Sequence, residues 1–377
     1  MLETSLAGEL IKTVEFKATI PIVNSYNEWD PLEEIIVGRI EGATVPSLKD
    51  KAVGTVVKAK DETSAKFFAE EGKHYPDSIA QKAQKEVDEF INILQGEGIV
   101  VRRPEEFDFS KPYETPYWRS SGFSASCPRD AFLVIGNEII EAPMSWRCRY
   151  YETLPYKKLF NYYFEQGAKW TSAPKPALAD SLFDNVEIPK DNSQKVQCVT
   201  NESEIVFDAA DFVRFGKDIV VARSHTTNYK GIEWLSRHLG DQYKIHCIDV
   251  KSKCPMHLDT TIIPVGPGQL IVNPKYFSKD SLPKIFKSWD IFIAPEPEII
   301  EGVTTTYFGS IWLSLNMLCI GPGRVIVEAR QKKLIKQLNE WGIETIPCNF
   351  AHFEPYEGSF HCATLDIRRK GTLESYF

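Results

Sequence analysis

The stretch FVRFGKDIVVAR (212–223) contains two runs rich in β-branched and aromatic residues on either side of Gly216 and Lys217. Such runs around a glycine turn are typical of a β-hairpin. The next stretch, KGIEWLSRHL (230–239), has apolar residues at the spacing of an amphipathic helix, and KIHCID (244–249) then forms a short β-rich run. The sequence therefore predicts a unit of hairpin, helix and strand.

The same unit recurs along the chain. Three more hairpins are predicted at AFLVIGNEIIEAP (131–143), TTIIPVGPGQLIVNP (260–274) and LNMLCIGPGRVIVEAR (315–330). Helices are predicted after them at 157–170, 281–289 and 331–342, and closing strands at 290–296 and 344–349. The GPG turns fit neither phosphate-loop pattern, so we interpret them as hairpin turns.

A looser unit opens the chain, with EEIIVGR (33–39), a helix at 80–98 and IVVRRP (99–104). We expect FHCATLDIRR (360–369) to supply the strand that completes it. The sequence thus predicts about five pseudo-symmetric ββαβ units in an α/β protein. Repeats that bury their faces against neighbours give one closed body, so we expect a single domain over residues 1–377, arranged as a ring. The regions 41–63, 104–122 and 183–204 are expected to be loops.

Composition excludes several classes of protein. The net charge of the 377 residues is −8 with acids and bases interspersed, which argues against nucleic acid or an anionic membrane as partner. We find no apolar run long enough to span a membrane and no secretory signal, so the cytoplasm is the expected compartment. The eight cysteines include no CxxC pair, which argues against a structural zinc site and a disulfide framework.

Candidate functional residues, most of them polar, stand at the entry of the first hairpin strand in successive units. They are Asp130, then Asp208 and Asp211, then His257 and Asp259, then Gly309 and Ser310 somewhat further ahead, and finally Cys362. If the units surround an axis, these entries converge at one end of the channel. Taken singly, each residue has an ordinary interpretation, as a turn aspartate, a structural histidine or a buried thiol.

Cys362 lies in the run GSFHCATLDIRRKGTLESYF (358–377) and is the candidate nucleophile. His361, Arg368 and Arg369 are the sequence neighbours expected to stabilise its thiolate, the reactive form of cysteine. His257 is the best-placed acid/base partner, and either Asp208 or Asp211 would orient it.

The carboxylates around this thiol indicate a cationic substrate. Asp130 and Asp259 would line the same cavity, and several anions beside a thiolate make sense only if the ligand is positive. A guanidinium is planar, forked and matched to carboxylates. We therefore infer that a cysteine thiolate attacks a guanidino carbon held by two aspartates, without a metal or cofactor.

Three segments carry a family resemblance: FDAADF (207–212), PMHLD (255–259) and GSFHCATLDIRRKGTLESY (358–376). They resemble the amidinotransferases, which include arginine:glycine amidinotransferase, the aminocyclitol enzymes of streptomycin pathways and the cyanobacterial toxin enzymes. SYNEWDPLEEIIVGR (25–39) and CPRDAFLVIGNEIIEAP (127–143) extend the similarity over nearly the whole chain. Within the family, the chain is most similar to the branch from cyanobacterial saxitoxin biosynthesis.

The resemblance implies a five-bladed α/β propeller. It implies that Cys362 is the nucleophile, His257 the general acid/base and Asp208 the partner of that histidine. Asp130 and Asp259 match the acids that bind the guanidinium. The implied reaction is ping-pong transfer of the amidino group from L-arginine to a small amine, releasing L-ornithine. No cofactor is implied, and the resemblance is compatible with a homodimer, for which the sequence carries no interface signal.

Four more residues of the expected substrate pocket can be compared with the family pattern. Two agree with it and two depart from it. Ser310 matches a donor-binding serine, and Met256 matches the arginine:glycine enzymes. Tyr276 stands where those enzymes have an arginine that recognises a carboxylate, and Gly309 replaces the first of two paired serines. Both changes remove polar contacts, so we expect a bulkier acceptor than glycine that lacks a carboxylate, such as a toxin-pathway intermediate.

Three other functions remain to be weighed. A guanidino hydrolase of the arginine-deiminase type would use the same residues with water as acceptor. A non-catalytic binding protein for guanidino compounds would not need both Cys362 and His257. A papain-like protease would place its cysteine before its histidine, whereas the order here is reversed.

Overall fold

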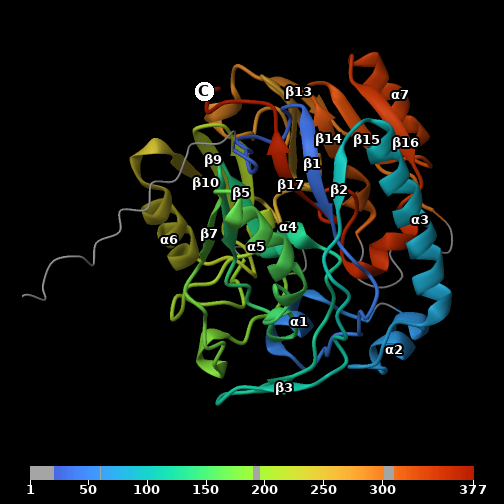
Figure 1. The fold of residues 1–377 in the computed structure, drawn as a ribbon, viewed down its shortest axis with the longest axis vertical. Coiled ribbons are helices and arrows are strands. Elements are labelled where there is room, and N and C mark those ends of the chain that lie inside the picture. The colour runs from blue at the N-terminus through green and yellow to red at the C-terminus, as the bar shows by residue number, and fades with distance from the viewer. Residues whose placement is uncertain (1–20, 60, 190–195, 301–309) are drawn as a thin grey trace, which may run out of the picture.

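The computed structural model describes residues 21–59, 61–189, 196–300 and 310–377. Within these ranges the chain forms five three-stranded sheets and one two-stranded ribbon (Figure 1). Each three-stranded sheet joins two strands antiparallel and adds a third strand parallel to one of them. The five predicted units are therefore confirmed as sheets, and the fold is an α/β propeller of five blades, four of which have an α-helix before the third strand among the described residues.

The blades follow the chain in order. The first contains β17 (Thr364–Arg369), β1 (Leu32–Val37), α3 (Asp77–Gly96) and β2 (Val100–Arg102). The second contains β5 (Phe132–Ile135), β6 (Glu138–Glu141), α5 (Lys157–Glu165) and β7 (Lys169–Ser172). The third contains β8 (Phe212–Phe215), β9 (Asp218–Ala222), α6 (Tyr229–Leu239) and β10 (Lys244–Ile248).

The remaining blades complete the ring. The fourth contains β11 (Ile262–Gly266), β12 (Gln269–Val272) and β13 (Asp290–Ile293). The fifth contains β14 (Leu318–Gly321), β15 (Arg324–Glu328), α7 (Lys332–Glu340) and β16 (Glu344–Cys348). Connecting segments hold α1 (Lys51–Val56), α2 (Glu62–Phe68), α4 (Pro128–Ala131) and the ribbon of β3 (Tyr113–Glu114) and β4 (Arg119–Ser120). Helices α3, α6 and α7 lie at the edge of the molecule (Figure 1).

The first blade is built from both ends of the described chain. Strand β17 pairs antiparallel with β1, with Leu365 opposite Ile36, and β2 lies parallel to β1 on its other side. Figure 1 shows the red β17 beside the blue β1. The strand predicted at 360–369 is thus confirmed at Thr364–Arg369.

The hairpin turns need glycine because the backbone adopts a left-handed conformation there. Gly136 has φ of 60° and Gly216 has φ of 70°. A side chain at Gly216 would also place its Cβ only 2.1 Å from the Glu374 carbonyl oxygen. The turn between β8 and β9 is therefore pressed against the C-terminal segment, which no larger residue would allow.

Three sequence predictions are wrong, the first of them for the region 104–122, which was expected to be a loop but holds the ribbon of β3 and β4. The helix expected at 281–289 is only a short 3₁₀ turn at Lys284–Phe286, because Pro283 lacks the N–H that would continue a helix through this segment. The region 41–63, expected to be a loop, contains α1, whose first turn is capped by the Asp50 carboxylate at the N–H of Ala52.

Aromatic packing holds the loop that precedes β17. Phe90 of α3 packs edge-on against Phe350 and Phe360, with ring centroids 5.0 and 5.1 Å apart. Phe350 also stacks on Phe360 at 4.5 Å. These contacts fix the segment that carries Cys362.

Among the described helices, none is both long and apolar enough to cross a membrane.

A buried ion network ties the blades together near the axis. Arg214 of β8 donates through Nε to Glu28 Oε1 at 2.7 Å and through Nη2 to Asp366 Oδ2 at 2.8 Å. Arg129 and Arg369 also pair with Asp366. Although burial raises it, the pKa of Asp366 is held well below its ordinary value by these three guanidinium groups. The network links segments from the first three blades.

We predict that Arg214→Met lowers the free energy of unfolding by about 3–5 kcal/mol, because it leaves buried carboxylates without their partner. Urea unfolding followed by circular dichroism measures the loss. Arg324→Met is the matched control, since Arg324 pairs with Glu344 at the exposed edge of the fifth blade and should cost far less. Equal losses in the two variants would contradict a structural role for the network.

Candidate active site

A cavity of about 240 Å³ opens at the end of the ring where the first strands begin. Six residues singled out from the sequence line it: Met256, His257, Asp259, Tyr276, Ser310 and Cys362. Gly309 lies outside the described residues, and Asp130, which was expected to line the same cavity, is not among the lining residues. Further lining comes from Val56 at the end of α1 and Val57 after it, from Lys253 and Lys275, and from Glu357.

The blade entries bring the candidate residues together. Asp130 lies in α4 just before β5, and Asp208 precedes the 3₁₀ turn Ala209–Asp211 that leads into β8. His257 and Asp259 stand ahead of β11, and Cys362 stands ahead of β17. Because each first strand begins at the same end of the ring, residues distant in sequence share one site.

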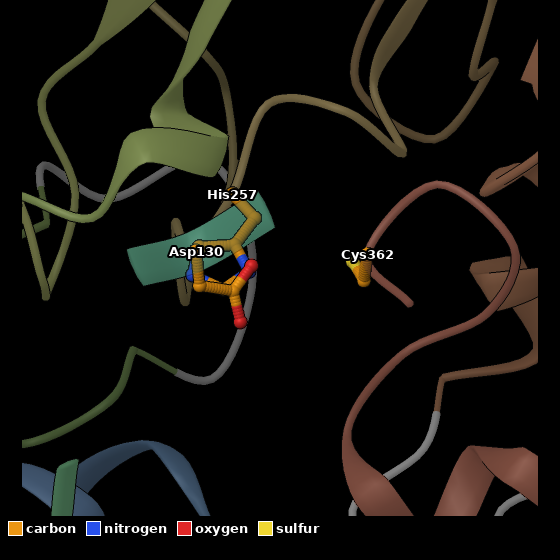
Figure 2. A group of neighbouring side chains, drawn as sticks. All are labelled: Asp130, His257 and Cys362. Atoms are coloured by element: carbon orange, nitrogen blue, oxygen red, sulfur yellow. The ribbon is translucent and has the colours of Figure 1, made fainter. Parts of the chain in front are cut away.

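Cys362, His257 and Asp130 form the centre of this site. Figure 2 shows the side chains of Asp130 and His257 next to each other, with Cys362 facing them from the loop before β17. One polar atom from each of the three lies within 4.8 Å of the others. This spacing allows a ligand atom to contact the thiol and the imidazole at once.

His257 lies between two carboxylates. Its Nε2 is 3.0 Å from Asp208 Oδ2, and its Nδ1 is 3.6 Å from Asp130 Oδ1. Burial alone would lower the pKa of His257, but the charges of Asp130 and Asp208 raise it well above its ordinary value. The backbone of His257 has φ of 54°, a strained conformation for a residue with a side chain. The two carboxylates therefore favour the protonated form of the imidazole.

The structure distinguishes Asp208 from Asp211, which the spacing alone left open. The carboxylate of Asp211 accepts hydrogen bonds from Ser224 at 2.6 Å and from Thr227 at 2.5 Å. Asp208 instead accepts from His257, while its backbone N–H donates to Thr227 Oγ1 at 3.1 Å. Asp211 supports the loop behind the site, and Asp208 contacts the imidazole.

The Cys362 thiol is surrounded by acids rather than by bases. Its Sγ donates to Asp259 Oδ2 at 3.2 Å. Burial, and then the charges of Asp259 and Asp130, raise the pKa of Cys362 well above its ordinary value. The expectation that Arg368 and Arg369 stabilise the thiolate is wrong, because Arg368 binds Glu33 and Glu34 and Arg369 binds Asp366.

Asp259 is held from two sides. Its Oδ2 accepts from Asn316 Nδ2 at 2.8 Å and from His361 Nδ1 at 2.8 Å. The other ring nitrogen of His361 lies 3.2 Å from Glu28 Oε2, so His361 joins Asp259 to the buried ion network. Burial raises the pKa of Asp259, but His361 outweighs burial and lowers it below its ordinary value.

Three carboxylate oxygens at the site have no hydrogen-bond partner among the described residues. They are Asp130 Oδ1, Asp208 Oδ1 and Asp259 Oδ1, and all three atoms are buried. Buried oxygens of this kind are normally paired, and leaving them unpaired costs free energy. The site is therefore built to receive a ligand with several N–H donors.

Several neighbours escaped the sequence analysis. Asn316 stands at the entry of β14 and donates to Asp259, so the strand-entry pattern would have found it in place of the more exposed Ser310. Arg149, which donates to Asp130 Oδ2 at 2.8 Å, carries no signal in the sequence. Glu357 follows a 3₁₀ segment in no repeated position.

The group of Asp130, His257 and Cys362 also has the spacing of a metal site. Arg149 already pairs with Asp130 Oδ2 at 2.8 Å, and its positive charge opposes a metal ion bound to that carboxylate. Asp130 Oδ1, which has no hydrogen-bond partner among the described residues, can still accept from an organic cation. The side chains present can supply a nucleophile, an acid/base and charge stabilisation without a cofactor.

Comparison with known proteins identifies the family. The chain is 44% identical over 366 residues to the L-arginine:L-lysine amidinotransferase of Pseudomonas savastanoi pv. phaseolicola, covering 97% of this chain and 99% of that protein. The chain belongs to the amidinotransferase family. The mitochondrial glycine amidinotransferase of Gallus gallus is also 44% identical to this amidinotransferase, over 94% of this chain and 85% of that one. No protein-family model matches.

Solved structures agree with this assignment. SxtG, an amidinotransferase of the saxitoxin biosynthetic pathway from Microseira wollei, matches with a TM-score of 0.90 and 49% identity, over 94% of this chain and 100% of that one. A dimethylarginine dimethylaminohydrolase matches with a TM-score of 0.55 and 14% identity, over 89% of this chain and 99% of that one. The second likeness concerns the fold alone.

We predict that Asp259→Asn shifts alkylation of Cys362 to lower pH. The charge of Asp259 disfavours the thiolate, so its removal lowers the pKa of Cys362 and gives more thiolate at a given pH. The measurement is the iodoacetamide reaction rate across pH, with peptide mass spectrometry to isolate Cys362 from the other cysteines. Asp241→Asn, an exposed control, should leave the profile unchanged. A profile that stays in place in Asp259→Asn would refute this electrostatic account.

Proposed function

We propose that this amidinotransferase moves the amidino group of L-arginine to an amine acceptor through a covalent amidino-Cys362 intermediate, with release of L-ornithine. One observation carries the proposal: the thiol of Cys362, the imidazole of His257 and the carboxylate of Asp130 lie within 4.8 Å of one another beside an acid-lined cavity. The Pseudomonas relative is named for an arginine donor, and this chain matches it along nearly its whole length.

The guanidinium of arginine fits the three unpaired carboxylate oxygens. Asp130 and Asp259 would accept its N–H groups and spread its positive charge, as forked guanidinium–carboxylate pairs do. The incoming cation would also lower the pKa of Cys362, offsetting the charge of Asp259. The nucleophile would thus be activated by its own substrate.

In the first half-reaction, Cys362 Sγ bonds to the guanidino carbon, and the bond from that carbon to the side-chain nitrogen of arginine breaks. His257 donates a proton to the departing nitrogen, and the thiol proton restores the charge on His257. Asp208 keeps the imidazole oriented through its 3.0 Å contact. The products are neutral-amine ornithine and a cationic amidino-cysteine.

In the second half-reaction, the acceptor amine attacks the amidino carbon, and the carbon–sulfur bond breaks. His257 gives its proton to the departing sulfur, which returns Cys362 to the thiol, and it then takes the proton of the attacking nitrogen. Asp130 and Asp259 hold the same positive charge in both halves, so they need not move between them. The product is the guanidino form of the acceptor.

Two lysines of the cavity wall offer a positive charge to the carboxylate of arginine. Lys275 and Lys253 line the cavity beside Tyr276. Burial raises the pKa of the neighbouring Cys254 to about 11, and the charges of the two lysines oppose that rise. Tyr276 replaces an arginine expected from the family pattern. We propose that Lys275 supplies the positive charge for the donor carboxylate in its place.

The acceptor that we propose is an amine of a toxin pathway rather than glycine. The similarity to SxtG at 49% identity favours a related acceptor. Tyr276 offers no fixed charge for a second carboxylate in the same position.

The compartment that we propose is the cytoplasm. All eight cysteines are free thiols, which fits a reducing compartment.

We predict that Cys362→Ala abolishes amidino transfer but still binds arginine, because the carboxylates that hold the guanidinium remain. Ornithine release measures transfer, and isothermal titration measures binding. Mass spectrometry of arginine-treated wild-type enzyme should reveal an amidino adduct on the peptide that contains Cys362. Absence of the adduct would rule out the covalent route, and citrulline as the sole product would show a hydrolase instead.

We predict that Lys275→Met raises KM for arginine about tenfold, the effect of losing roughly 1.4 kcal/mol of charge-assisted binding. The kcat should change much less, because in this proposal Lys275 contacts the carboxylate of arginine and not the carbon–nitrogen bond that breaks. Steady-state assays of ornithine release check this. Lys279→Met is the matched control, since Lys279 is exposed and does not line the cavity. An unchanged KM in Lys275→Met would reject this residue as the carboxylate partner.

A further inference from the structure

Glu357 faces the same cavity from the loop between the 3₁₀ segment Ala351–Tyr356 and Cys362. Among the described residues its carboxylate makes no hydrogen bond and no ion pair, although it is partly buried. The acids at the floor of the site are fixed by Arg149, His257 and His361. Glu357 is therefore the lining acid whose charge the protein itself leaves unmatched.

The backbone at Glu357 is strained. Its φ of 72° lies in the left-handed region, where a residue with a side chain costs about 1 kcal/mol more than glycine. The adjacent Gly358 lies so close to the nucleophile that an added Cβ would be 2.5 Å from Cys362 Cβ. The loop is pressed against the reactive thiol, and Glu357 occupies a position that glycine would fill more favourably.

The environment of Glu357 makes its carboxyl group sensitive to a bound cation. Burial raises its pKa to about 8, and the charges of Asp130 and Asp208 add to the rise, while Arg149 and His257 oppose it. A ligand cation beside Glu357 would favour the ionised form and relieve the repulsion from the other acids. No described residue forms a hydrogen bond or ion pair with this carboxylate that would give it a structural role.

In the covalent intermediate, the amidino group already occupies Asp130 and Asp259. The acceptor must then approach Cys362 through the rest of the cavity, where Glu357 lies. We propose that Glu357 selects an acceptor that carries a second cationic group, an amine or a guanidine, in addition to the amine that is modified. This assignment rests on the proposed function and names the chemical class of the acceptor.

The charges of the cavity divide between the two substrates. Lys253 and Lys275 favour the carboxylate of the donor, while Glu357 ionises beside a cation and so favours a cationic group in the acceptor. A diamine brings such a group toward Glu357, whereas an amino acid acceptor such as glycine brings a negative charge that keeps Glu357 protonated. Specificity then comes from a charge pair that only the right acceptor can form.

The test compares putrescine with n-butylamine, which has the same carbon chain but lacks the second amine. With arginine as donor, wild-type enzyme should favour putrescine at least about tenfold in kcat/KM, the effect expected of one charge-assisted contact. Glu357→Gln keeps the shape of the side chain and should reduce the preference to about twofold or less. Glu357→Gly should do the same while matching or exceeding the wild-type melting temperature, because glycine suits φ of 72°.

The preference is a ratio within each variant, so a change in the donor half-reaction does not affect it. Glu340→Gln removes an exposed charge on α7 and should retain the wild-type preference. The burst of ornithine from arginine alone is measured in parallel. A wild-type enzyme without a burst would overturn the proposed function, whereas a normal burst with no diamine preference, or a preference that survives in Glu357→Gln, would overturn the role of Glu357.

Discussion

The buried pairing of Asp366 with three arginines is the interaction on which the rest of the molecule depends. Arg129 comes from α4 just before the second blade, Arg214 from the third blade and Arg369 from the first, and all three are buried. A guanidinium without its carboxylate in such a place would be costly, so the blades can close only in the register that completes the pairs. The arrangement of the blades is thus specified by buried charge pairs near the propeller axis as well as by apolar packing.

This network also determines the chemistry at one end of the ring. Glu28 binds Arg214 on one side and His361 on the other, and His361 holds Asp259. The carboxylate beside the nucleophile is therefore anchored to the same charges that align the blades. A rigid scaffold explains how buried oxygens can remain unpaired in the free enzyme, because the side chains that bear them cannot rotate to find other partners.

A protonated resting thiol is the chemical consequence of this acidic surrounding. Asp130 and Asp259 disfavour the thiolate, and under the proposed mechanism the bound guanidinium offsets their charge, so that the reactive form arises with the substrate already in place. Such an arrangement protects Cys362 from electrophiles and oxidants in the empty enzyme. The same acids give little help to a neutral ligand, which separates guanidino compounds from most other metabolites.

The sequence predicts the repeats and the blade entries well because both depend on local patterns. Alternating β-rich runs and glycine turns identify the hairpins, and the entry positions identify Asp130, His257 and Cys362. The prediction fails where long-range context decides. Pro283 ends a helix that periodicity favours, and Arg368 and Arg369 follow Cys362 in sequence yet bind acids elsewhere. Arg149 and Glu357 approach the site from loops, for which no periodic signal exists.

Closure of the ring by β17 also affects the stage of folding at which the candidate site forms. Cys362 leads directly into β17, whose partner β1 lies near the opposite end of the chain, with Leu365 beside Ile36. Contacts between such distant segments form late in folding, because a large loop must be closed before they gain any free energy. The loop that carries the thiol is therefore held in place by a pairing between distant parts of the chain. Under the proposed function, catalytic competence is coupled to the formation of this pairing.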